Sequence, residues 1–123
     1  MKILVDTHVF LWMLSCPEKL NVKRRYDLES PANEVFLSSI SIAELMIKSS
    51  IGEIDIDFDP LETAKQMQVE ILDFSGTHAA ALGQLPLHHK DPFDRMILAQ
   101  AMTNKLLLMT EDQKFSAYDC SII

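Results

Sequence analysis

The sequence predicts an α/β fold with a mostly parallel central sheet of about five strands flanked by helices. Short apolar runs alternate with helical patterns along all 123 residues, an arrangement typical of strand–helix–strand units. One run, residues 106–109, is continuously apolar, as expected for a central parallel strand covered on both faces. The length is that of one domain. We therefore expect residues 1–123 to form a single domain.

The first half of the chain contains two expected strands, residues 2–5 and 35–37, which are short apolar runs. Helical patterns follow each of them, at residues 9–14, 18–29 and 41–50. Gly52 stands where a glycine commonly ends a helix. In residues 53–59, acidic and apolar residues alternate, which indicates an exposed extended segment.

The second half repeats the alternation. We expect helices at residues 61–68, 77–85 and 91–104, and strands at residues 69–74 and 106–109. A short turn passes through Phe115, and residues 121–123 are a candidate edge strand.

Each of several acidic residues has an ordinary structural role available. Asp6 follows the first strand and is suited to cap the next helix. Ser41-Ile42-Ala43-Glu44 matches a capping box, in which Glu44 would reach back to its own helix start. Similar roles exist for Asp91 as a cap before Pro92, for Asp94 in the first helical turn, and for Asp112 before the turn at Phe115.

The joint arrangement of these acids is harder to explain by capping alone. Asp6, Glu44 and Asp112 lie at or just beyond the carboxyl ends of different expected strands, and Asp94 begins the helix that leads to the last long strand. In a parallel sheet those ends share one edge, where ligands bind. Four carboxylates gathered there would repel unless a cation were present or their pKa values rose.

An all-oxygen ligand set favours a hard cation such as Mg²⁺ or Mn²⁺. Mg²⁺ keeps several waters and takes few protein carboxylates directly, which leaves positions for phosphate oxygens. Metal-assisted phosphodiester hydrolysis has this requirement.

Four sequence blocks also resemble a known family. Ile3-Leu4-Val5-Asp6-Thr7-His8 and Ser41-Ile42-Ala43-Glu44-Leu45 resemble the first two acidic motifs of PIN-domain ribonucleases. Asp91-Pro92-Phe93-Asp94-Arg95 and Leu107-Leu108-Met109-Thr110-Glu111-Asp112 resemble the remaining two. The match extends from residue 3 to about residue 118 in order and spacing. It is strongest to the VapC-type toxins of bacterial toxin–antitoxin pairs.

The resemblance implies a Mg²⁺- or Mn²⁺-dependent endoribonuclease that is usually a homodimer. It also implies a cognate antitoxin whose C-terminal segment lies over the active groove. Carried over by position, Asp6, Glu44 and Asp94 match the core acids, and Asp112 matches the more variable fourth. We expect Asp6, Asp94 and, directly or through water, Asp112 to hold the metal, and Glu44 to orient or deprotonate the attacking water.

Other polar residues near these motifs have open roles. Thr110 matches a polar residue near the metal in some family members, and Asp91 is an additional acid of this subgroup. His8 is expected on the helix surface or beside the site, and Arg95 could pair with Asp91 or reach a phosphate. The pair His88-His89 fits a solvated loop better than a zinc site, since no further ligands stand at zinc spacing.

The charge balance limits how the protein could bind RNA. With 18 Asp and Glu against 11 Lys and Arg, the net charge is −7, which argues against non-specific binding over the whole surface. If four acids form a metal site, part of that excess belongs to the site. Lys23-Arg24-Arg25 is the only basic cluster; it is either a solvated helix face or a source of phosphate contacts.

The cysteines and the hydropathy pattern bear on the compartment of the protein. The chain has two distant cysteines, Cys16 and Cys120, no signal-peptide pattern and no apolar run of membrane-spanning length. These features favour a cytoplasmic protein.

Two alternative functions remain open. One is a catalytically inert PIN-like module that binds RNA or a protein partner. Another is a different α/β metal-dependent phosphohydrolase or phosphotransfer domain. In that class a dehalogenase-like hydrolase would need a second Asp where His8 stands.

Overall fold

Four strands, all paired in parallel, form the sheet in the order β3-β2-β1-β4. The computed structural model describes residues 1–88 and 90–123, and this strand count refers to them. The register places Ile3 between Val35 and Leu107. The strands are β1 (Lys2–Val5), β2 (Glu34–Ser38), β3 (Glu70–Leu72) and β4 (Leu107–Met109). The predicted α/β fold with a parallel sheet is therefore confirmed.

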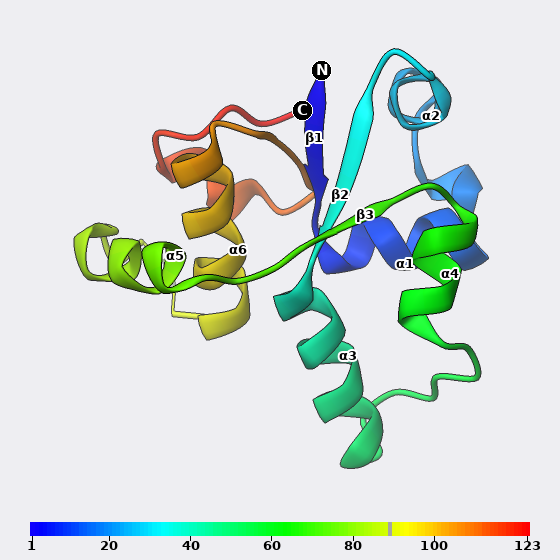
Figure 1. The fold of residues 1–123 in the computed structure, drawn as a ribbon, viewed down its shortest axis with the longest axis horizontal. Coiled ribbons are helices and arrows are strands. Elements are labelled where there is room, and N and C mark those ends of the chain that lie inside the picture. The colour runs from blue at the N-terminus through cyan, green and yellow to red at the C-terminus, as the bar shows by residue number, and fades with distance from the viewer. Residues whose placement is uncertain (89) are drawn as a thin grey trace.

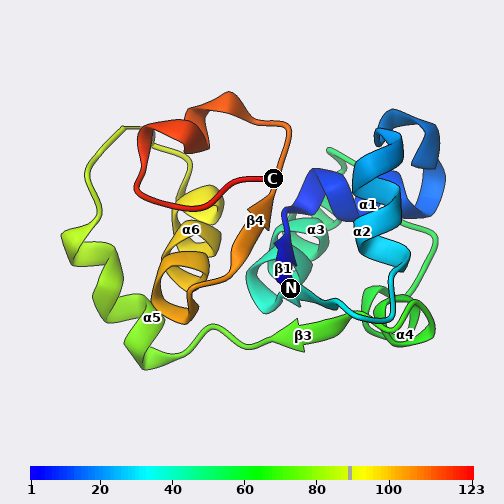
Figure 2. The same cartoon turned by 90° about the horizontal axis from the view of Figure 1, so that it is seen from above.

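Helices connect the strands and cover both faces of the sheet. Figure 1 shows α5 and α6 on one side and α1, α2 and α4 on the other, and Figure 2 shows the same layers from above. The α-helices are α1 (Thr7–Ser15), α2 (Val22–Glu29), α3 (Ser39–Ser50), α4 (Pro60–Gln66), α5 (Gly76–Ala81) and α6 (Pro92–Asn104). Short 3₁₀ turns occupy Pro17–Lys19, Leu82–Gln84 and Gln113–Ala117. Within the described residues, no helix is long and apolar enough to cross a bilayer.

Alternate side chains of β1 point into two separate cores. Ile3 and Val5 belong to a cluster with Phe10 of α1 and Leu45 of α3. Leu4, between them, belongs to a second cluster with residues of α6 and β4, among them Ile97, Leu98 and Leu108. Because successive side chains of a strand point to opposite faces, a strand that is apolar at every position needs both faces covered.

The structure corrects several predicted boundaries. The helix expected at residues 18–29 is divided, because Leu20 is extended and the side chain of Asn21 accepts a hydrogen bond from the Arg24 backbone N–H at 2.8 Å, starting a new helix. The candidate edge strand at residues 121–123 forms only one parallel bridge, Leu108 with Ile122. The fifth strand is thus reduced to a single bridge beside β4.

A buried polar contact fixes α6 against the far half of the sheet. The Gln100 side chain is fully buried, and its Nε2 donates to the Leu72 carbonyl oxygen of β3 at 3.1 Å. Its Oε1 accepts a hydrogen bond from the Ser38 hydroxyl at the end of β2. Since unpaired buried polar groups are costly, this contact selects one position of α6 relative to β2 and β3.

Replacing Gln100 with Leu should therefore destabilise the protein by about 2–4 kcal/mol, since two buried polar groups would lose their partner. Chemical denaturation with urea measures the effect. The control is Gln66→Leu in the exposed last turn of α4, which should change stability by less than about 0.5 kcal/mol. Equal unfolding midpoints for the two variants would contradict this role of Gln100.

Candidate active site

Asp6 is placed at the carboxyl edge of the sheet by the end of β1. It is the N-cap of α1, and its Oδ1 accepts a hydrogen bond from the Val9 backbone N–H at 2.8 Å. Its Oδ2 accepts a hydrogen bond from the Thr110 hydroxyl, which follows β4. Only 5% of Asp6 is exposed. This burial raises the pKa of Asp6, and the hydrogen bonds from Thr110 and Val9 offset part of that rise.

Glu44 is held between two helices on the same edge. Its Oε1 lies 2.8 Å from the hydroxyl of Thr7, which itself lies 2.9 Å from the Ser41 hydroxyl. Its Oε2 forms an ion pair with Lys48 Nζ at 2.8 Å, one turn further along α3. The hydrogen bond to Glu44 is the main reason that the pKa of Lys48 is raised.

The capping-box interpretation of Glu44 is wrong. Helix α3 begins at Ser39, and its N-cap is Ser38, whose side chain accepts a hydrogen bond from the Ile40 backbone N–H. Ser41 is thus inside the helix, and its hydroxyl faces Thr7. Glu44 consequently has no capping task, yet it is a buried acid with only 5% of its surface exposed.

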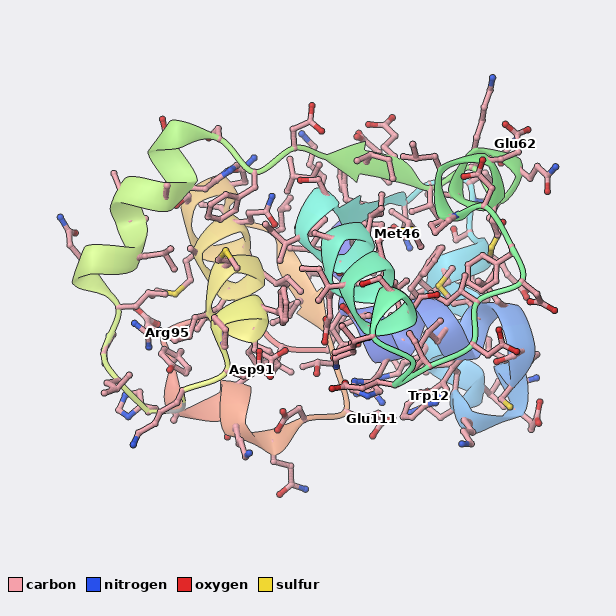
Figure 3. The ribbon with its side chains drawn as sticks, turned by 90° about the horizontal axis from the view of Figure 1, so that it is seen from below. Trp12, Met46, Glu62, Asp91, Arg95 and Glu111 are labelled. Carbon is pink, nitrogen blue, oxygen red and sulfur yellow. The ribbon has the colours of Figure 1, made fainter. Side chains whose placement is uncertain are left out.

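Helix α6 brings two more acids to this edge. Asp91 is its N-cap, accepting a hydrogen bond from the Asp94 backbone N–H at 3.1 Å, and Pro92 is its first residue. The predicted role of Asp91 as the cap and the predicted place of Asp94 in the first helical turn are both confirmed. Seen from the end at which the strands finish, Asp91 lies at the start of α6, and Glu111 lies on the segment that follows β4 (Figure 3).

Asp112, the last of the four predicted site acids, follows β4 and caps the turn Gln113–Ala117. Its Oδ1 accepts a hydrogen bond from the Lys114 backbone N–H at 2.9 Å. Its own backbone N–H donates to the Thr110 hydroxyl at 3.0 Å. Thr110 therefore connects Asp112 to Asp6.

The charges of these acids act on one another. The pKa of Asp94 rises to about 7, first because the side chain is partly buried, and then because of the negative charges of Asp91, Glu44, Asp112 and Asp6. The other four carboxylates are therefore near enough to Asp94 for their charges to act on it. The edge of the sheet thus brings together residues that are up to 106 positions apart in the sequence.

The donor set suits a hard divalent cation. The acids supply carboxylate oxygens, and a bound cation would offset both the burial and the neighbouring negative charges that raise the pKa of Asp94. Among the described residues, however, no three Asp, Glu, His or Cys side chains are yet close enough to form a ready coordination shell. Asp6, Asp94 and Asp112 would have to close around the ion, while Glu44 is engaged by Thr7 and Lys48.

Arginines predicted near the site serve other contacts. Arg95 does not pair with Asp91 in the structure but donates to the carbonyl oxygens of Pro86 and Leu85, at 3.0 and 3.4 Å. In the basic cluster, Arg24 is bound to Glu111 and to two backbone carbonyls. His8 is exposed beside Asp6, and its charge lowers the pKa of that acid.

The histidine pair falls only partly within the structure. His88 is exposed, and its ring packs edge to face against Tyr118 with centroids 4.9 Å apart. His89 lies outside the described residues.

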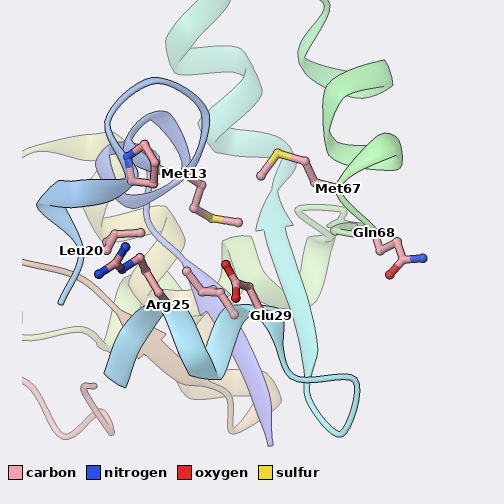
Figure 4. Close-up of a pocket in the computed structure, with 8 residues that line it drawn as sticks. Met13, Leu20, Arg25, Glu29, Met67 and Gln68 are labelled. Carbon is pink, nitrogen blue, oxygen red and sulfur yellow. The ribbon is translucent and has the colours of Figure 1, made fainter. Parts of the chain in front are cut away.

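Two hollows in the described part of the structure differ in where they lie relative to the acids. A hollow of about 320 Å³ lies between α1, α2 and the turn after α4, with Met13, Leu20 and Met67 along its walls and Arg25 and Glu29 nearby (Figure 4). A smaller hollow of about 240 Å³ adjoins Asp112 and is also lined by Thr110 and Arg24. Because only the second adjoins the acids, pocket size does not locate the chemistry here.

Comparison with known proteins gives the family. The sequence model of the PIN domain matches residues 3–119. The chain belongs to the PIN-domain family. This confirms the family resemblance found in the four acidic blocks.

Among individual proteins, this PIN domain is similar to Ribonuclease VapC22 of Mycobacterium tuberculosis. The two are 27% identical over 119 residues, which are 94% of this chain and 91% of the relative. It also shares its fold with VapBC2 from Rickettsia felis, solved bound to a promoter DNA fragment, with a TM-score of 0.72 at 19% identity over 100% of this chain and 98% of that chain. FitAcB from Neisseria gonorrhoeae has a TM-score of 0.67 at 23% identity, covering 98% of this chain and 96% of that chain.

Two residues that hold Glu44 were not singled out in the sequence. Lys48 could have been found, because a Glu and a Lys four positions apart on a helix face one another. Thr7 offered no comparable signal, since its contact with Glu44 spans 37 positions and depends on how α1 packs against α3.

Asp94→Asn should stabilise the metal-free protein at high pH. Below about pH 4 Asp94 is protonated in both the folded and the unfolded protein, so its ionisation costs nothing. As the pH rises to about 7, the unfolded chain loses this proton while the folded protein retains it, so wild-type stability falls relative to the variant. Solvent screens part of this cost at a partly exposed side chain, and we expect a gain of about 1 kcal/mol, or roughly 4 °C, at pH 8.

Thermal unfolding in EDTA between pH 4 and pH 8 measures this difference. Exposed Asp57 provides the control variant Asp57→Asn, for which no such pH-dependent gain is expected. A constant difference between Asp94→Asn and wild type over this pH range would contradict the prediction.

Proposed function

We propose that this PIN domain is a Mg²⁺-dependent endoribonuclease, and that it is the toxin of a toxin–antitoxin pair. The observation that carries the proposal is the geometry at one edge of the sheet, where the Thr110 hydroxyl joins Asp6 to Asp112 and Thr7 holds Glu44. The negative charges of Glu44, Asp112 and Asp6 also contribute to the raised pKa of Asp94, which lies in the first turn of α6. The family assignment and the similarity to a ribonuclease support it. Mn²⁺ should substitute for Mg²⁺, since both prefer oxygen ligands.

In this proposal Asp6, Asp94 and Asp112 would hold the metal, with Asp112 acting directly or through water. When bound, Mg²⁺ supplies charge stabilisation to a phosphodiester and makes a coordinated water more acidic. The raised pKa of Asp94 is relevant here, because an acid that is half-protonated near neutral pH without a cation ionises fully beside one. Metal binding at pH 7 should therefore release a proton from about half of the molecules, those in which Asp94 is still protonated.

Glu44 would orient the attacking water and accept its proton. Thr7 and Lys48 each engage one of its oxygens, which fixes the plane of the carboxylate. Each carboxylate oxygen has a second lone-pair site, so a water can still be bound. Thr110 would keep Asp6 oriented, since its hydroxyl donates to Asp6 Oδ2 and has no second proton to donate elsewhere.

Changing the acids should abolish cleavage of RNA without unfolding the protein. Asp6→Asn, Asp94→Asn and Glu44→Gln should each reduce the cleavage rate by at least about 100-fold, the usual scale for metal ligands and general bases. Cleavage of a mixed fluorescent RNA pool in Mg²⁺ measures this, and EDTA should stop the wild-type reaction until Mg²⁺ or Mn²⁺ is restored.

The matched controls are Asp55→Asn and Asp57→Asn, which remove exposed carboxylates of the extended segment before α4. Both should cleave at the wild-type rate. If folded Asp6→Asn and Asp94→Asn cleave as well as wild type, the proposed chemistry is wrong. If wild type binds RNA yet cleaves none in Mg²⁺ or Mn²⁺, an inert binding module replaces the nuclease.

The proposed partners are an RNA substrate, a cognate antitoxin and a second copy of the chain. Several proteins with this fold were solved as VapBC or FitAB complexes, which supports an antitoxin partner. Expression of wild type in a bacterial host should arrest growth, and Asp6→Asn should not. Co-expression of the cognate antitoxin should restore growth, and continued arrest with both proteins soluble would count against the pairing.

A further inference from the structure

Arg24 links helix α2 to the segment that carries part of the acidic site. Its Nη2 donates hydrogen bonds to the carbonyl oxygens of Thr110 and Ile123, both at 3.0 Å. Its Nη1 forms an ion pair with the Glu111 carboxylate. The Arg24 side chain is only 18% exposed, and its two hydrogen bonds to backbone oxygens are partly buried. One side chain therefore binds three groups from two separate segments.

Those segments determine where Thr110 lies. The Thr110 backbone N–H donates to the Ile123 carbonyl oxygen at 3.4 Å, so Ile123 receives bonds from both Thr110 and Arg24. Arg24 thus holds the backbone of Thr110 directly through its carbonyl and indirectly through Ile123.

Thr110 in turn contacts two of the acids. Its hydroxyl donates to Asp6 Oδ2 and accepts a hydrogen bond from the Asp112 backbone N–H at 3.0 Å. Both functions of this hydroxyl depend on the position of the Thr110 backbone. A displacement of the segment would move Asp112 and deprive Asp6 Oδ2 of its hydroxyl donor.

The ion pair adds a charge effect. Glu111 stands between Thr110 and Asp112, and its side chain is 45% exposed. Arg24 balances this charge next to a cluster that already contains five acids. Without the guanidinium, the segment would carry two adjacent uncompensated carboxylates, which would repel the cluster and favour outward displacement.

We infer that Arg24 is a positioning residue of the active site: from outside the acidic cluster it holds the Thr110–Asp112 segment in place for the reaction. The inference rests on the proposed function, because the reaction it refers to is the proposed RNA cleavage. Arginine suits the task because its planar guanidinium offers several donors in a fixed arrangement, whereas a lysine ammonium is a single flexible point charge. Lysine at this position should keep the charge but not bind all three groups at once.

A positioning role for Arg24 differs from the phosphate contact that the basic cluster Lys23-Arg24-Arg25 suggests. A residue that only attracts RNA would affect binding, and lysine would replace it with little loss. A positioning residue affects the chemical step, since small displacements of reacting groups cost large factors in rate. The two roles therefore predict different effects of Arg24→Lys on kcat, on KM and on deuterium exchange in the metal-free protein.

The test compares Arg24→Lys with Arg25→Lys, a matched change at the next, exposed position of α2. Arg24→Lys should lower kcat for RNA cleavage about tenfold or more, with KM within twofold of wild type. In the metal-free protein, the backbone amides of Thr110 and Asp112 should exchange with deuterium about tenfold faster. Arg25→Lys should match wild type in all three measurements.

Glu111→Gln provides a milder variant that leaves the two carbonyl contacts of Arg24 available, and it should lie between wild type and Arg24→Lys. A rise in KM without a change in kcat in Arg24→Lys, if lowering the salt concentration removes it, would overturn the inference in favour of a phosphate contact. Unchanged kcat and exchange in Arg24→Lys would also overturn it, as would equal losses in Arg25→Lys.

Asp6→Asn, measured in parallel, separates the two hypotheses. If Asp6→Asn still cleaves RNA, the proposed function fails, and the exchange measurement alone decides whether Arg24 holds the segment. If Asp6→Asn is inactive while Arg24→Lys behaves as wild type, only the role of Arg24 fails.

Discussion

The close approach of like charges at one end of the sheet is the constraint on which the rest of this structure depends. Parallel strands necessarily bring their carboxyl ends to one edge, and here β1, β2 and β4 each lead into one of the acids. The protein reduces the resulting repulsion in separate places. Thr110 and a backbone N–H support Asp6, and Lys48 balances Glu44. Arg24 balances Glu111 beside the cluster. The pKa of Asp94 stays raised, first because the side chain is partly buried and then because of the neighbouring negative charges.

Structural and chemical roles are combined in the same carboxylates. Asp6, Asp91 and Asp112 all cap helical segments, and helix N-termini favour negative charge. Capping uses only the Oδ1 of each acid, and in Asp6 the other oxygen, Oδ2, accepts a hydrogen bond from Thr110. A capping role is therefore no argument against a role at the site. Glu44 is the exception, since it has no cap to make and is buried against Thr7 and Lys48.

The negative net charge has a more specific meaning in this arrangement. Much of the acidity at the sheet edge would be compensated by a cation, and the cation would then also attract phosphate. Arg24 and Arg95, two of the few arginines near the site, are engaged with carbonyl groups of the chain. RNA binding should accordingly depend on the metal and on local shape more than on a basic surface, and remain weak without the metal.

The sequence by itself determined the alternation of strands and helices along the chain, the parallel sheet, the positions of Asp6 and Asp112 just after a strand, and those of Asp91 and Asp94 at the start of a helix. Those features depend on local periodicity and capping, which neighbouring residues encode. Only the tertiary structure decided that α3 starts at Ser39, that Gln100 joins α6 to β2 and β3, and that Thr7 holds Glu44. It also assigned Arg24 to Thr110 and Ile123. These contacts join groups from about 30 to 100 positions apart, and which groups meet depends on how buried helices pack, which no local pattern specifies.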